Sequence, residues 1–257
     1  MPRQLLTRRW VLTTLLVLAG VAVCIRLGIW QLDRLAARKE FNARVEAQLT
    51  APELDLNRES LGAGLVDREY RSVTVSGEYD FGEEVLLRNQ VYDSRLGYHV
   101  FTPLKISGSD QSILVERGWI PKEDADAAGL QKYRENGRVT VKGVLRRSME
   151  SPDFGGVPNP TLAPGQNRLE AWSYINLAQI QQQSQLKLLP VYIQQAPAAG
   201  LPAAPVRELI LPEISEGPHL GYALQWFTFA TILGVGYPFF VRQQLKAAGR
   251  KTASEKA

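Results

Sequence analysis

"WVLTTLLVLAGVAVCIRLGIW", residues 10–30, is a run of apolar and small residues with a single charged side chain, Arg26. As an α-helix its twenty-one residues would extend roughly 31 Å, which is enough to cross the hydrocarbon core of a bilayer. A second run of similar length opens at His219 and continues to about Val241. The two runs predict a membrane protein with transmembrane helices at residues 10–30 and 218–241.

A cleaved signal peptide is the alternative interpretation of the first run, because arginines precede an apolar stretch in both cases. Cleavage requires small residues at fixed positions, and the stretch Val21-Ala-Val-Cys24 has valine where a small residue is needed. We therefore expect an uncleaved anchor.

The orientation follows from the basic residues at the two short ends, which face the cytoplasm in membrane proteins. Residues 1–9 carry Arg3, Arg8 and Arg9, and the tail 242–257 carries Arg242, Lys246, Arg250, Lys251 and Lys256 against Glu255 alone. Both ends are expected in the cytoplasm, and residues 31–217 on the other side. The nine residues before the first run are too few for a mitochondrial transit peptide, which favours a bacterial inner membrane with a periplasmic domain.

The net charge of +4 is a weak indication of nucleic-acid binding, since the basic tails account for it and no nucleic-acid-binding motif is present. The single cysteine, Cys24, lies within the first apolar run. Residues 31–217 therefore have neither a disulfide framework nor the thiol pair that copper chaperones and thiol oxidoreductases use. We expect the lipid bilayer as a partner and no nucleic acid.

The segment between the spans reads as one β-rich α+β domain, an antiparallel sheet or a small barrel. A helix continues out of the first span over residues 34–49, and Asn176 is a plausible N-cap for a helix over 177–186. Residues 151–168 and 196–205 are rich in Pro, Gly or Ala and are expected to be loops. Short stretches of β character lie at residues 71–76, 85–92, 98–102, 112–116, 138–145 and 189–194.

No constellation for catalysis is visible in this domain. Nucleophilic catalysis needs a base beside the nucleophile, and the only histidine in the domain, His99, has no serine, lysine or metalloprotease motif to complete it. We expect His99 to be a partly buried structural residue. The sequence therefore predicts a binding module and not an enzyme, and the substances that it binds are not evident from these features.

Five blocks of sequence stand out in order along the chain. They are Leu27-Gly-Ile-Trp30-Gln31-Leu-Asp-Arg34, Glu69-Tyr70-Arg71-Ser-Val73 with Gly77, Leu96-Gly97-Tyr98-His99-Val-Phe-Thr102-Pro103-Leu104, Val115-Glu116-Arg117-Gly118-Trp119-Ile120-Pro121, and His219-Leu220-Gly-Tyr222-Ala223-Leu-Gln225-Trp226-Phe227. Together they resemble the Surfeit locus protein 1 family, and the resemblance extends from Leu27 to Trp226. Three departures from the family pattern occur: Arg38 stands where the family often has Lys, Glu116 stands where it has Asn, and Gly217-Pro218 precede His219 where Asn is frequent.

The resemblance implies an assembly factor for cytochrome c oxidase with two spans. Bacterial relatives are thought to bind haem a transiently and to help deliver it to the catalytic subunit. Subunit I of the oxidase and the haem a synthesis machinery are the implied partners. His219 is the implied ligand of the haem iron, and a haem-free scaffold that stabilises an assembly intermediate remains the alternative.

The residues around His219 suit this role. His219, Tyr222, Ala223, Trp226 and Ala230 share one face of a helix by the i, i+3, i+4 and i+7 rule. Arg26 and Arg34 of the first span are candidates to meet the haem propionates. The structural alternative is that Tyr and Trp belong to the interfacial belts and that small residues serve helix packing. We interpret Trp30, Gln31, Gly118 and Trp119 as mainly structural, with Gly118 in a turn or bulge that admits Trp119.

Overall fold

The computed structural model describes residues 7–152, 154–162 and 165–254. Its residues form two compact units, which are residues 1–44 with 214–257, and residues 45–213. Arg3, Glu255 and Lys256, on which the expected orientation partly rests, lie outside the described residues, as do residues 153, 163 and 164 of the expected loop at 151–168.

The first unit is built from two long helices, α1 (Arg8–Thr50) and α4 (His219–Ser254). Both are long and apolar enough to cross a membrane, with mean hydropathies of 2.2 and 1.3 over their most apolar windows. Only 11% and 6% of those windows are buried, so their leucines and valines are left exposed, unlike those of a core helix in a soluble protein. The predicted helical continuation over residues 34–49 is confirmed, because α1 runs unbroken to Thr50.

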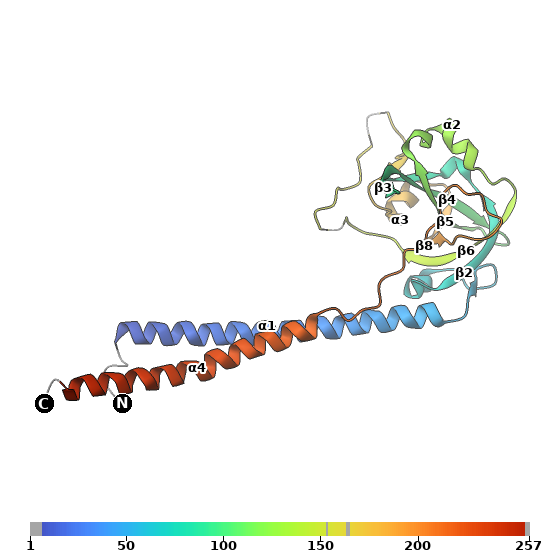
Figure 1. Ribbon diagram of the computed structural model, residues 1–257. Helices are drawn as coiled ribbons and strands as arrows, with labels where there is room; N and C mark the ends of the chain where they lie inside the picture. Colours follow the sequence, from blue (N-terminus) through green and yellow to red (C-terminus); the bar gives the residue numbers. More distant parts are fainter. Residues whose placement is uncertain (1–6, 153, 163–164, 255–257) are drawn as a thin grey trace. The chain divides into compact units, whose positions relative to one another are not determined.

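The second unit is a small β-barrel (Figure 1). Strands β2, β6, β8, β5 and β4 pair in that order, and β2 also pairs with β4, which closes the sheet on itself. Strand β3 and the two-residue strands β1 and β7 extend it at its edges. The strands are β1 (Leu54–Asp55), β2 (Ser72–Tyr79), β3 (Val85–Tyr92), β4 (Arg95–Ile106), β5 (Gln111–Pro121), β6 (Arg138–Arg147), β7 (Ala171–Trp172) and β8 (Lys187–Gln195).

Short helices connect these strands. Helix α3 begins after Asn176, whose side chain accepts a hydrogen bond from the amide of Gln179 at 3.0 Å, as expected of an N-cap. It ends at Gln183, three residues before the predicted end. The short helices are η2 (Ala63–Arg68), η3 (Phe81–Glu83), η4 (Lys122–Asp124), α2 (Ala127–Leu130), η5 (Gln131–Tyr133) and α3 (Leu177–Gln183).

The six predicted β segments lie in strands, apart from Arg71, which immediately precedes β2, and the prediction of a small barrel is confirmed. The expected antiparallel pairing holds only in part, because β5 pairs with β8 in parallel, as do β1 with β2 and β3 with β7. Parallel strands require a long crossover connection. Here the chain reaches β8 only after β6 and the long loop that precedes α3, a topology that the residues of β5 and β8 do not indicate.

The barrel has an apolar interior and a second apolar cluster outside it. Alternate residues of β5 separate the two, since Ile113 and Val115 face inward while Leu114 packs under α3 with Phe101 and Ile180. This explains why β5 is apolar at consecutive positions, because both of its faces are covered.

A β-bulge interrupts this alternation at Arg117. Val100 of β4 pairs with Gly118 and Phe101 pairs with Glu116, so that Arg117 has no partner on β4. Gly118 has φ = +123°, where a side chain is strained, and a Cβ there would lie 2.4 Å from the carbonyl oxygen of Val206. The expectation of a turn or bulge at Gly118 is therefore confirmed.

The side chain of Arg117 is 1% exposed and is held by carboxylates and aromatic rings. Its Nη2 lies 2.9 Å from Glu135 Oε1 and its Nη1 lies 3.5 Å from Glu84 Oε2. Its guanidinium carbon lies 4.8 Å from the ring centroid of Tyr79 and 5.4 Å from that of Phe81. A buried cation needs such partners, because removal from water is otherwise very costly.

A second buried arginine joins the same carboxylate. Arg207 Nη2 lies 3.0 Å from Glu135 Oε1, and its Nη1 donates to the carbonyl oxygens of Pro202 and Pro205. Trp119 and Val206 exchange two backbone hydrogen bonds of 2.8 Å. The segment that follows β8 is thus fixed to β5 beside the bulge.

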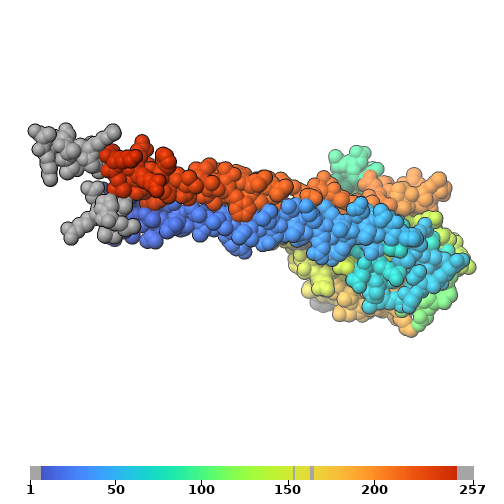
Figure 2. Space-filling view, turned by 90° about the horizontal axis from the view of Figure 1, so that it is seen from below, coloured from blue at the N-terminus to red at the C-terminus, as the bar shows by residue number. Residues whose placement is uncertain are grey.

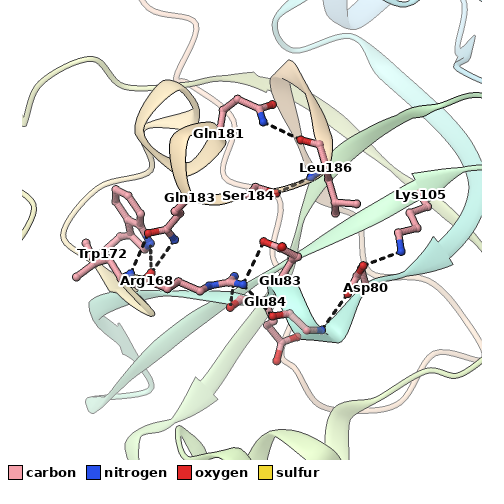
Figure 3. A network of polar contacts seen from close by, with 12 residues as sticks. Asp80, Glu83, Glu84, Lys105, Arg168, Trp172, Gln181, Gln183, Ser184 and Leu186 are labelled. Atoms are coloured by element: carbon pink, nitrogen blue, oxygen red, sulfur yellow. Dashed lines mark hydrogen bonds and ion pairs between the residues drawn. The ribbon is translucent and has the colours of Figure 1, made fainter. Parts of the chain in front are cut away.

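A third arginine, Arg168, binds the segment at η3 that carries Glu84, the partner of Arg117 (Figure 3). Arg168 donates to the carbonyl oxygens of Gly82 and Glu84 and lies 3.1 Å from a carboxylate oxygen of Glu83. The neighbouring Glu84 accepts a 2.5 Å hydrogen bond from the hydroxyl of Thr102. Burial raises the pKa of Glu84, although Thr102 and Arg117 partly offset this effect.

Replacing Arg117 with methionine should lower the free energy of unfolding by about 3–5 kcal/mol, because it leaves buried carboxylates without their cation. The measurement is urea unfolding of the full-length protein in detergent, followed by tryptophan fluorescence. Arg58→Met, at an exposed Asp55 pair, is the matched control and should change stability by less than about 1 kcal/mol. Equal effects of the two substitutions would contradict a central role for Arg117.

Glu84→Gln should flatten the dependence of stability on pH above pH 4.5. The raised pKa means that the folded protein retains this proton to a higher pH than the unfolded chain, whose group titrates near 4.5. Proton loss therefore favours unfolding, and the free energy of unfolding falls as pH rises from 4.5 through the raised pKa. Urea midpoints of both proteins between pH 4.5 and neutrality test this, and parallel curves would refute it.

Candidate functional site

Helices α1 and α4 lie antiparallel and in contact along much of their length (Figure 2). As the residue numbers increase along α1, the numbers of the residues that they contact decrease along α4. Small residues allow the two helices to approach closely. At Gly28, a Cβ would lie 2.7 Å from the ring of Phe227. The paired residues include Trp10 with Phe240, Thr14 with Tyr237 at 2.6 Å, Gly20 with Leu233, Gln31 with His219, and Lys39 with Glu216.

The residues at which the two helices face each other are spaced alternately three and four apart, as in a left-handed helix pair. We call this row of facing residues the seam. All the residues of this seam are buried or half-buried, in contrast to the exposed residues between them. They are Val21, Cys24, Gly28, Gln31, Leu35, Arg38 and Asn42 on α1, and His219, Ala223, Trp226, Ala230, Tyr237 and Val241 on α4.

His219 is the first residue of α4, and its ring faces α1. Its Nδ1 lies 2.8 Å from Oε1 of Gln31. An amide oxygen accepts only, so this contact favours, for the neutral ring, the tautomer with the proton on Nδ1 and the electron pair on Nε2. Among the described residues, none forms a hydrogen bond with Nε2. This edge of the ring borders Gly217, where a Cβ would lie 3.6 Å from Nε2.

The aromatic residues proposed to flank a ligand differ in their exposure. Ala223 is 1% exposed and Ala230 is 8% exposed, so both are covered by α1. Trp226 is half-buried on the same seam and packs edge-on against Phe229, with ring centroids 6.0 Å apart. Tyr222 lies beside the seam and is 48% exposed.

The two arginines lie on different sides of α1, and both are exposed. Arg34 is three residues beyond Gln31 and therefore lies on the flank of the seam, one helical turn from the residue that contacts His219. Arg26 is two residues from both Cys24 and Gly28, so about 200° of helical turn directs it away from α4. Arg34, and not Arg26, thus lies on the side of α1 that carries Gln31.

The second histidine lies in the barrel wall. His99 Nδ1 is 2.5 Å from Glu116 Oε1, and both side chains are largely buried. They line a cavity of about 90 Å³ together with Trp119, Gln194 and other residues. Glu116, which departs from the family pattern, is thus the partner of His99, and the expected partial burial of His99 is confirmed.

The described residues contain no group of three or more His, Cys, Asp and Glu side chains that could hold a metal ion. His219, which forms a hydrogen bond through Nδ1, could add one imidazole ligand to a haem, whose porphyrin supplies its own four nitrogens.

Sequence reasoning missed two features of the site and its supporting domain. Gln31 was interpreted as structural, although it is a polar residue on the inner seam at the end of an apolar span, which is a signal for a buried hydrogen bond. The network of Arg117, Glu84, Glu135 and Arg207 was also missed. Its only local signal is the pair Glu116-Arg117 within an otherwise apolar strand.

Three similar proteins cover most of this chain. A SURF1-like protein of Rickettsia felis is 28% identical over 238 residues, with 90% of this chain and 97% of the relative aligned. An uncharacterised SURF1-like protein of Mycobacterium bovis is 26% identical over 261 residues, covering 98% and 92%. A SURF1-like protein of Caenorhabditis briggsae is 23% identical over 244 residues, covering 87% and 73%.

The family model described as SURF1 family matches residues 18–231. The match begins in α1, includes the whole barrel and ends in α4 beyond His219. The chain therefore belongs to the SURF1 family.

Proposed function

We propose that this protein is a membrane-anchored, non-enzymatic factor that binds haem a and assists its insertion into the catalytic subunit of cytochrome c oxidase. Membership of the SURF1 family implies a role in the assembly of this oxidase. Haem a binding, subunit I as the recipient and the haem a synthesis machinery as the donor are our proposals.

One observation supports haem binding above all others, which is the hydrogen bonding of the His219 ring. Its Nδ1 is engaged by Gln31 at 2.8 Å, and its Nε2 edge borders a glycine. A neutral imidazole with a free Nε2 is the form that binds iron. This donor would therefore suit a haem, with His219 as the residue that would hold it.

The neighbouring residues have supporting roles in this proposal. The half-buried ring of Trp226 and the exposed ring of Tyr222 provide aromatic surface for a flat macrocycle with an apolar tail. Arg34, which flanks the seam close to His219, is the arginine better placed to meet a propionate. Arg26 points away from α4 and is better placed for lipid headgroups.

We propose a bacterial inner membrane as the location, with both termini in the cytoplasm and the barrel in the periplasm. The two candidate spans and the bacterial relatives fit a membrane protein. In this arrangement His219 lies at the periplasmic end of its span, where a polar ring is less costly than at the bilayer centre.

His219→Ala should abolish or strongly reduce haem a copurifying with the full-length protein when the haem a synthesis enzymes are coexpressed. The measurement is the haem content per protein and the Soret band of the detergent-purified protein. His99→Gln, at the second histidine and with an amide that still donates to Glu116, should leave both unchanged.

Two outcomes would refute haem ligation by His219. Unchanged haem content and spectrum in His219→Ala would exclude it as the ligand. A wild-type protein that stays colourless with haem a present, yet is required for oxidase assembly, would establish the haem-free scaffold instead.

The orientation can be tested by fusions to the full-length chain. Alkaline phosphatase inserted after Leu130, between α2 and η5 in the connection from β5 to β6, should be active because it folds only outside the cytoplasm. A fluorescent protein fused to the C-terminus should fluoresce, since it matures in the cytoplasm. Inactive phosphatase at Leu130 would contradict the proposed topology.

A further inference from the structure

We propose that Gln31 is a positioning residue that fixes the tautomer and orientation of His219, so that Nε2 presents its electron pair to the haem iron. This inference rests on the proposed function and extends it to a residue of the other helix. It also predicts a property of the protein without haem, namely the location of the imidazole proton.

The contact joins two residues that are 188 positions apart in the chain. The atoms Nδ1 and Oε1 are 2.8 Å apart, which is ordinary for a hydrogen bond donated by an imidazole N–H to an amide oxygen. Both residues belong to the seam, where neighbouring positions are closed to solvent. Leu35, one turn beyond Gln31, is 8% exposed, and Ala223, one turn beyond His219, is 1% exposed.

The backbone on which His219 stands is also tied to α1. Nε of Arg38 donates to the carbonyl oxygen of Ser215 at 2.9 Å, and Lys39 pairs with Glu216 at 3.5 Å. The amide of Gly217 donates to the Ser215 hydroxyl at 3.2 Å. Residues 215–217 are thus held before the helix begins, and Gln31 adds the contact that sets the ring itself.

The chemistry of an imidazole makes this contact consequential. A neutral ring has one N–H, and an acceptor at Nδ1 stabilises the tautomer whose Nε2 is unprotonated. The same hydrogen bond strengthens Nε2 as a ligand, and losing such a partner typically lowers metal affinity about 10–100-fold. Without the acceptor, the ring is free to rotate and to protonate Nε2, which then cannot bind iron.

A purely structural role makes a different prediction. If the hydrogen bond served only to join the helices, its loss would affect the stability of the helix pair and leave haem affinity and the ring proton unchanged. The two roles are therefore separated by one measurement on the protein without haem and another with it.

The first measurement is the nitrogen NMR spectrum of the full-length apoprotein in detergent, with labelled histidine and His99→Gln to remove the other signal. We expect the wild-type His219 ring to carry its proton on Nδ1. Gln31→Leu should shift the population toward the Nε2–H form, while Gln31→Glu, which keeps an acceptor oxygen, should retain the wild-type form.

The second measurement is a titration of the same variants with haem a, followed at the Soret band. Gln31→Leu should weaken binding about 10–100-fold, and Gln31→Glu should bind at least as tightly as the wild type, with a more negative reduction potential because a carboxylate makes the ligand more basic. Gln225→Leu is the matched control, since Gln225 is an exposed glutamine of α4 outside the seam, and it should bind like the wild type.

The outcomes distinguish this inference from the function on which it rests. A proton on Nε2 in the wild-type apoprotein, or Gln31→Leu and Gln225→Leu binding haem equally, would overturn the role of Gln31 alone. Unchanged haem binding in His219→Ala would overturn the proposed ligand itself. Loss of binding in Gln31→Leu that Gln31→Glu does not rescue would also contradict the inference.

Discussion

The site at His219 depends on the packing of α4 against α1. A hydrogen bond between neutral side chains forms only where two helices approach closely, and small seam residues such as Gly28 and Ala223 allow this approach. The bond of Gln31 to His219 then links a residue near the start of the chain to one near its end. Neither helix alone would present the imidazole with one nitrogen engaged and the other open.

The barrel depends on a different constraint, the burial of Arg117. The bulge at Gly118 turns this side chain toward Glu84, Glu135 and the ring of Tyr79, and Glu135 also holds Arg207. A buried network is stable only when each charge has its partners. The network therefore fixes η3, β5 and the segment after β8 relative to one another within the domain.

The sequence predicts those parts of the fold that depend on local patterns. Alternation of polar and apolar residues located the strands, and Asn176 located the start of α3. The parallel pairing of β5 with β8 could not be predicted, because strand residues do not reveal their neighbours. The same limit applies to the site. His219 was recognised as a candidate ligand, but its bond to Gln31 joins residues 188 positions apart. The partners of Arg117 are likewise scattered, between residues 79 and 135.

The two histidines show why the local environment, and not residue type, decides which of them can serve a haem. Both have Nδ1 engaged, His99 by Glu116 and His219 by Gln31. His99 faces a cavity of about 90 Å³, well below the roughly 300–1,000 Å³ of typical ligand pockets, so a macrocycle does not fit there. His219 stands at the end of an apolar helix pair, with a glycine beside Nε2 and Tyr222 exposed one turn away. The proposed haem would be a large apolar ligand that has to be handed on, and an exposed site would serve it better than an enclosed pocket, because an exposed site leaves a path for release.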